Sequence, residues 1–398
     1  MALLQIEGMQ TEPAGSRWPL WRLGFRPFYW LAAAWAAVIV PVWLGEFSGR
    51  LAPLPGLNGL PWHVHEMLYG YTVAVVAGFL LTAVRNWTGR PTPTGWPLAG
   101  LTLLWLAGRL LLPVAPLALG APVDLAFLPC LAWVVRRRLR AANNRRNAFV
   151  PRLLLALAAL NLAFYLPHAG WLALDPLLPL RTALMLVVSL TVIMAGRLHP
   201  LFTRNAVAPI KQYSSDRLER WIAPLTLAVL LADLAPLPAW VLAPANLALA
   251  GLHFWRGWGW APLATWRKPI LWILHLSYLA LPCALLLAVP AAFGRLPWLV
   301  MEHVLGIGVV GGLTLGMMVR SALGHTGRAL ATGRLETLAF VALMLAVPLR
   351  VAYWLLPAAG GYLPWLWTAG SLWTLAFALF VWRFTPILNR ARVDGKAG

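Results

Sequence analysis

The feature that most constrains this chain is a succession of long apolar runs, separated by short segments that hold most of its charged residues. Hydrophobic residues make up 61% of the 398 positions and charged residues only 11%, whereas soluble domains are roughly half apolar and about a quarter charged. Too few polar residues remain to cover a water-soluble globule. The composition therefore excludes a soluble enzyme, a disordered chain and a coiled coil. It predicts an all-α polytopic membrane protein.

The lengths of the apolar runs predict a bundle of about twelve transmembrane helices. An α-helix rises about 1.5 Å per residue, so about 20 apolar residues cross a bilayer. The runs lack the alternation of β-barrel strands, and a helix satisfies its own backbone hydrogen bonds in lipid. We predict spans at 28–45, 65–85, 97–114, 118–137, 151–169, 178–198, 221–240, 242–257, 269–290, 297–319, 336–356 and 364–385.

These spans form one membrane domain, 28–385, without a soluble module. We expect residues 1–27 to be a cytoplasmic tail with an interfacial lead-in rather than a cleavable signal peptide, because the first apolar run comes late and is too long. Residues 386–398 are expected to form a cytoplasmic C-terminal tail.

The basic residues predict the orientation of the bundle. The formal net charge is +20, but the positive residues lie in short clusters between apolar runs rather than on one surface, so nucleic-acid binding is not expected. With twelve spans and a cytoplasmic N-terminus, nearly all of them fall on one side. Only Arg50, Arg181, Arg295 and Arg350 fall on the other, and Arg109 lies within a span. This asymmetry places both termini in the cytoplasm.

The segment Trp62-His63-Val64-His65-Glu66-Met67 is the densest group of polar residues within the apolar runs. Imidazole, carboxylate and thioether groups are donors to transition metals, and imidazole with thioether suits copper. His63 and His65 would converge on one ion only if the helix began around them. The alternative is that these residues anchor a helix end at the membrane interface. We favour a metal site.

Two further histidines lie alone on apolar helices, and each is suited to be an axial ligand of haem. They are His275, near the cytoplasmic end of its span, and His303, near the outer end. A histidine that bonds to a neighbouring helix is the alternative for each. The glycines after His303 permit close approach of another helix or of a flat cofactor, and helix packing is the commoner use.

A basic turn follows this span and carries Arg320, His325 and Arg328. These residues are candidates to hold a haem propionate, a metal or a lipid phosphate, because arginine suits bidentate recognition of carboxylates. A loop retained by the positive-inside rule is the alternative. Glu66 and Glu302 are the candidate catalytic proton carriers.

Depth along the spans separates two sets of candidates. His63, His65 and His303 form an outer set, and His275 and His325 form an inner set. The sequence predicts no ligand role for the other three histidines or for two further acidic residues: His168 and His253 are taken as interfacial, His199 as structural, and Asp124 and Asp233 as solvated or capping residues.

Several of these segments, in the same order, resemble the NnrS family. The matching segments are Gly24-Phe25-Arg26-Pro27-Phe28, Trp62 to Met67, Gly78 to Ala83, Asn86-Trp87-Thr88-Gly89, Phe202-Thr203-Arg204-Asn205, Leu274 to Tyr278, Leu323 to Arg328, Trp382-Arg383-Phe384 and Arg392 to Gly395. The resemblance implies a bacterial inner-membrane protein with twelve spans, haem b and copper, linked to nitric-oxide stress and denitrification.

The resemblance also bears on individual residues. His63, His65, His275, His303 and His325 match family histidines, and Tyr278 joins His275 as an expected cofactor-binding residue. His199 departs from the family pattern. Which histidine holds which metal does not follow from the match.

The function expected from these residues is to bind, reduce or detoxify nitric oxide, with a nitric-oxide reductase as the enzymatic form. One alternative is a metal or small-molecule transporter that uses the same histidines, although the sequence shows no convincing internal repeat of the kind transporters have. Another is a haem-based nitric-oxide sensor. Nitric oxide and the lipid bilayer are the expected partners, whereas the electron donor and the oligomeric state are not predicted.

Overall fold

The computed structural model describes residues 18–356 and 361–396, and this part of the chain is helical with short connections. The ends of both predicted tails, 1–17 and 397–398, lie outside the described residues. The elements are η1 (Pro19–Trp21), α1 (Phe25–Phe47), α2 (Gly59–His65), η2 (Glu66–Thr72), α3 (Val73–Thr88), α4 (Gly95–Leu111), α5 (Leu117–Ala141), η3 (Arg145–Asn147), α6 (Phe149–His168), α7 (Leu177–Ala206), α8 (Asp216–Ala232), α9 (Ala239–Trp258), η4 (Pro262–Thr265), α10 (Pro269–Ala292), α11 (Leu299–His303), η5 (Val304–Gly311), α12 (Gly312–His325), α13 (Arg334–Leu355) and α14 (Tyr362–Leu388).

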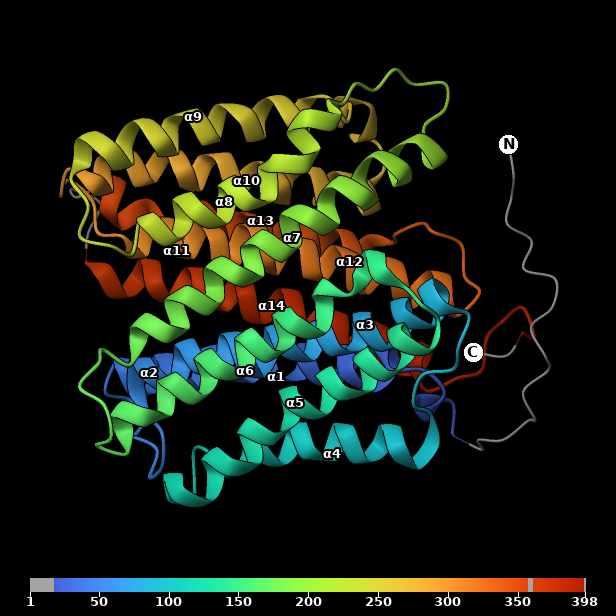
Figure 1. The fold of residues 1–398 in the computed structure, drawn as a ribbon, viewed down its shortest axis with the longest axis horizontal. Helices are drawn as coiled ribbons and strands as arrows, with labels where there is room; N and C mark the ends of the chain where they lie inside the picture. Colours follow the sequence, from blue (N-terminus) through green and yellow to red (C-terminus); the bar gives the residue numbers. More distant parts are fainter. Residues whose placement is uncertain (1–17, 357–360, 397–398) are drawn as a thin grey trace.

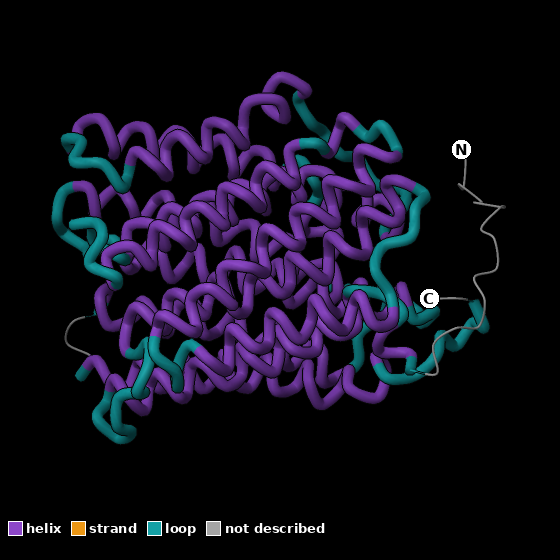
Figure 2. The backbone as a smooth tube through the Cα atoms, turned by 60° about the horizontal axis from the view of Figure 1, so that its bottom comes forward, coloured by secondary structure: helices purple, strands orange, loops and turns teal. Residues whose placement is uncertain are grey.

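These elements form twelve helical rods in the described part of the chain, because α2, η2 and α3 are continuous, as are α11, η5 and α12. The rods lie side by side along the long axis of Figure 1, and the connections gather at the two ends of the bundle in Figure 2. Nine of the rods are long and apolar enough to cross a membrane. The all-α polytopic prediction is confirmed to that extent, and crossing by α4, α8 and α9 stays a prediction.

Many predicted boundaries are wrong by three to eight residues, and the largest errors are the ends of α7, at Ala206 rather than 198, and α8, at Ala232 rather than 240. The first helix begins at Phe25 rather than 28, the second at Gly59 rather than 65, and the last continues to Leu388 rather than 385. The first two helices carry Pro27 and Pro61 in their opening turns, where the missing N–H removes no helical hydrogen bond. A search for apolar runs therefore misses the beginnings of α1 and α2, because their first turns are polar or contain proline.

The connections keep the charge asymmetry expected from the sequence. The described connections at one end of the bundle contain Arg22, Arg90, Arg145, Arg146, Lys211, Arg267, Lys268, Arg328, Arg390, Arg392 and Lys396. Those at the other end contain Arg50 and Arg295. Residues 18 and 396 lie at the first end, which the positive-inside rule predicts to be the cytoplasmic end. We call the opposite end the outer end.

Two central rods contain π-helical segments, η2 and η5, immediately after His65 and His303. π-Helical segments are rare in proteins, and those that occur are often found at functional sites. Except for Gly306, the glycines in and after η5 face other helices: added β-carbons at Gly308 and Gly316 would contact Ala280 and Leu274 of α10, and one at Gly311 would contact Trp373 of α14. These glycines therefore serve close helix packing.

Candidate functional site

Near the outer end, six polar side chains from five neighbouring elements meet in a buried polar cluster. Its members are His65, Glu66, Arg109, Asp124, Asn161 and Tyr165. His65 and Glu66 are fully buried. The guanidinium of Arg109 lies between the two carboxylates, with Nε 3.0 Å from Glu66 Oε2 and an ion pair to Asp124. Asp124 was predicted to be solvated or capping, and the structure corrects this.

Both ring nitrogens of His65 face oxygen acceptors. Nδ1 lies 2.9 Å from Glu66 Oε1, and Nε2 lies 3.0 Å from Oδ1 of Asn161, whose amide nitrogen donates to Asp124. An imidazole that donates from both nitrogens is an imidazolium. One imidazolium and one guanidinium balance the two carboxylates, so the buried polar cluster is neutral as a whole. In this arrangement His65 presents no lone pair to a metal.

His63 lies on another side of the same helix. Its ring stacks on Trp43 of α1, with centroids 4.1 Å apart, and its Nδ1 is buried without a hydrogen-bond partner. Because the helix begins at Gly59, positions two residues apart point in different directions. The structure therefore does not bring His63 and His65 together, and the helix does not begin where their convergence would require.

At the same outer end, His303 of α11 lies within electrostatic reach of His63 and of Arg350. Its Nδ1 bonds to the carbonyl oxygen of Leu299 at 2.7 Å. Because Nδ1 is held by an acceptor, neutral His303 keeps the lone pair of Nε2 for another ligand. Glu302 forms an ion pair with Arg181 of α7 and is partly exposed, so its predicted role in proton transfer would require that pair to open.

The inner half holds a second group of imidazoles, which we call the inner histidine cluster: His199, His253 and His275 with Tyr278. The rings of His199 on α7 and His275 on α10 have centroids 5.5 Å apart. Nε2 of His275 lies 2.8 Å from Thr203 Oγ1, whereas Nδ1 of His199 is buried without a hydrogen-bond partner.

The rest of this cluster is tightly bonded. Nδ1 of His253 lies 2.7 Å from the Tyr278 hydroxyl, which also accepts from Arg256 Nη1 at 2.9 Å. His253 is fully buried and His199 nearly so, which corrects the interfacial interpretation of His253. Sequence reasoning set both residues aside. The sequence feature that points toward His199 is the neighbouring segment Phe202 to Asn205, one of the segments that resemble the family.

An apolar cavity of about 100 Å³ lies beside this cluster, between α1, α3, α6, α7 and α12. Its wall is almost wholly apolar and includes Met194, Ala195, Met317 and the imidazole of His199. Pockets for drug-sized ligands measure roughly 300–1,000 Å³. The cavity therefore suits a small apolar molecule, and it would have to widen to admit a group as large as haem.

The predicted basic residues do not form one site. Arg320 lies over the ring of Phe202 at 3.8 Å, one turn beyond His199 and Met317 toward the cytoplasm. His325 instead packs against Phe25 of α1, with centroids 5.5 Å apart, and its carbonyl accepts from Arg392. Arg328 lies in the following loop. Arg320 is thus close to the inner histidine cluster, and His325 belongs to the α1 side.

The candidate haem ligands His275 and His303 lie at opposite ends of the bundle. Counting residues along α10 and α11 separates them by roughly 20 Å along the axis, so they cannot ligate one iron together. Among the described residues, no group of three or more His, Cys, Asp or Glu side chains is arranged to hold a metal ion. The imidazoles with a nitrogen available, those of His63, His199 and His303, could each supply one ligand to a haem iron or a copper.

Comparison with known proteins places the chain in a family. The sequence model described as NnrS protein matches residues 19–392. No curated protein matches the chain.

Proposed function

The chain belongs to the NnrS family, and on that premise we propose that it binds haem b and copper in the bacterial inner membrane and uses them to bind and reduce or detoxify nitric oxide. The family is linked to the nitric-oxide response.

One observation carries this proposal: His199 lines an apolar cavity, and its ring lies 5.5 Å from that of His275 on a different helix. Nitric oxide is small and apolar, so it dissolves in lipid and is compatible with a cavity of about 100 Å³ whose wall lacks charged groups. The imidazole of His199 belongs to that wall and has a buried nitrogen without a partner. A buried polar atom of this kind is explained by an additional ligand.

We assign the metal nearest the cavity to His275 and His199, with Tyr278 fixed beside them. Thr203 orients the His275 ring through its hydroxyl, as outer hydrogen bonds do for metal-ligating histidines. Arg320 supplies positive charge on the cytoplasmic side of this site, where a propionate would be stabilised. When bound, haem and copper would supply the redox chemistry.

His63 and His303 are the second proposed pair of metal ligands, and His325 and Arg328 remain separate candidates. His65 and Glu66, bonded within the buried polar cluster, are assigned to proton handling, together with Glu302. A copper ion bound at either ring nitrogen of His65 would displace the hydrogen bond made by that nitrogen, to Glu66 or to Asn161.

The test is a reduced-minus-oxidised spectrum and a metal analysis of the purified full chain. His199→Ala and His275→Ala should each remove or strongly shift the haem Soret band. His168→Ala is the matched control, since His168 bonds only to a carbonyl of its own helix among the described groups. A colourless wild-type protein without iron would refute the haem proposal and favour the transporter alternative.

A further inference from the structure

The outer end of the bundle contains a buried arginine whose charge is not balanced by a carboxylate. Arg350 of α13 is 6% exposed, and its Nη2 donates to the hydroxyl of Tyr362 at 2.8 Å. No described carboxylate forms an ion pair with it. The four residues after α13 that lie outside the described range, 357–360, are Pro-Ala-Ala-Gly, so they include no acidic residue. Arginines within membrane proteins normally have an anionic partner, because an isolated buried charge is costly.

The acidic side chains at the outer end all have other partners. Glu66 and Asp124 bind Arg109, Glu302 binds Arg181, Glu46 accepts from the backbone N–H groups of Leu54 and Gly59, Asp175 accepts from the N–H of Leu177, and Asp233 accepts from Asn246. The counter-charge of Arg350 therefore has to come from outside the described chain.

Three further nitrogens near Arg350 are buried and lack hydrogen-bond partners in the described structure: Trp43 Nε1, His63 Nδ1 and Trp354 Nε1. Indole nitrogens only donate, and an imidazole can donate from either nitrogen. Arg350 acts electrostatically on His63. Such orphaned donors call for an explanation by a bound group.

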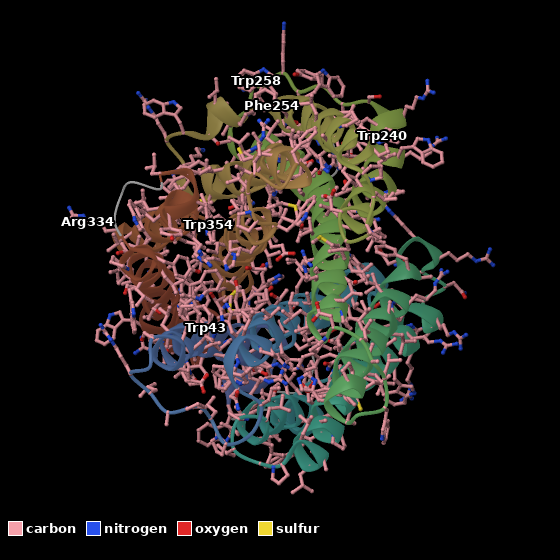
Figure 3. The ribbon with its side chains drawn as sticks, turned by 90° about the vertical axis from the view of Figure 1, so that its left-hand side faces the viewer. Trp43, Trp240, Phe254, Trp258, Arg334 and Trp354 are labelled. Carbon is pink, nitrogen blue, oxygen red and sulfur yellow. The ribbon has the colours of Figure 1, made fainter. Side chains whose placement is uncertain are left out.

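Ring contacts connect the helices that carry these donors. The Trp43 ring stacks on His63, and its centroid lies 5.2 Å from that of Phe47. The Phe47 ring centroid lies 6.1 Å from that of Tyr362. Tyr362 in turn contacts Trp354, with centroids 6.2 Å apart. Figure 3 labels Trp43 on α1 and Trp354 on α13, and both helices pack on α14. We call Trp43, His63, Arg350, Trp354 and Tyr362 the outer donor cluster.

We propose that the outer donor cluster binds a small monovalent inorganic anion, with the Arg350 guanidinium as its counter-charge. The cluster offers N–H and O–H donors around one fixed cation, which is the complement of one negative charge. A monovalent ion such as chloride or nitrite matches the single positive charge of Arg350.

The experiment measures anion-dependent stability of the purified full-length protein. Chloride or nitrite replaces gluconate at constant ionic strength, up to about 100 mM, and a specific site raises the unfolding temperature by about 1–2 °C with saturation. Saturation by chloride and nitrite alike indicates a general small-anion site, whereas saturation by one of them identifies the ion. A linear, unsaturated change for both ions in the wild type overturns the proposal.

Arg350→Gln should abolish the saturable shift or weaken binding at least tenfold. Arg295→Gln, the same substitution at an exposed residue of the outer end, should retain it. Because Arg350→Gln can impair folding, Trp354→Phe provides a second test: it keeps the aromatic body, removes one donor and should weaken binding several-fold. Wild-type binding in both Arg350→Gln and Trp354→Phe overturns the proposal. Metal content, measured on the same samples, separates failure of this site from failure of the proposed haem and copper function.

Discussion

Nε2 of His65 lies 3.0 Å from Oδ1 of Asn161, a side chain 96 residues further along the chain. This contact closes the buried polar cluster, because the amide nitrogen of Asn161 donates to Asp124 while its oxygen accepts from His65. The Asn161 amide therefore bridges the His65 ring and the Asp124 carboxylate through two hydrogen bonds. The neutrality of the cluster explains how two carboxylates can stay buried in an apolar bundle.

Arg109→Met should be strongly destabilising. It removes the only guanidinium in the buried polar cluster and leaves Glu66 and Asp124 with one cation between them. Breaking a buried ion pair in this way costs about 3–5 kcal/mol. Thermal unfolding in detergent measures the loss. Arg136→Met, at an exposed position of α5, should leave the unfolding temperature within about 1 °C of wild type. The double variant Arg109→Met/Asp124→Asn should recover part of the loss, and equal or greater destabilisation would argue against charge balance as the cause.

Gly312→Ala should destabilise the contact between α12 and α10. An added β-carbon would collide with the Ser277 hydroxyl and approach the Met344 methyl, and overpacking of this kind costs about 1–3 kcal/mol. Gly306→Ala is the matched control, because nothing lies within 4 Å of its added β-carbon, so it should be neutral or stabilising. Ser277→Gly should restore stability in the Gly312→Ala background. The absence of any difference between the two glycine variants would contradict the packing.

Ala195→Leu should fill part of the apolar cavity, because Ala195 is buried on its wall. We expect unfolding stability to change by no more than about 1 kcal/mol, since the added methyl groups occupy existing space. Uptake of nitric oxide by the purified protein, followed with an electrode, should slow several-fold. Ala156→Leu, at an exposed position of α6 away from the cavity wall, serves as a comparison. Unchanged uptake in Ala195→Leu would show that the gas takes another route.

Asp233→Asn should stabilise the protein at high pH. Asp233 lies in the turn after α8, and burial raises its pKa to about 6. A carboxyl whose folded pKa exceeds its unfolded value favours folding fully only below the unfolded pKa, near 4, and this contribution is lost as the pH rises through about 6. Asparagine resembles the protonated form and still accepts from Asn246. The variant should therefore gain about 1–2 kcal/mol over wild type at pH 8 and little at pH 4. Equal gains at both pH values would exclude titration of Asp233 as the cause.

The sequence by itself determined the helical class and the membrane character, and it predicted the orientation. Runs of about 20 apolar residues and the segregation of arginine and lysine between connections are local properties, and the physics of lipid acts on them directly. It also indicated His63, His275 and His303 as unusual, because an imidazole in an apolar run stands out without any knowledge of its neighbours.

Only the tertiary structure decided which of these residues share a site. His65 and Asn161 meet because α2 packs near α6, and His199 meets His275 because α7 packs near α10. The sequence grouped His63 with His65 since they are two residues apart, but a helix that begins at Gly59 sends them to different neighbours. A partner supplied by another helix depends on how the whole bundle packs, and no local pattern in the chain records it.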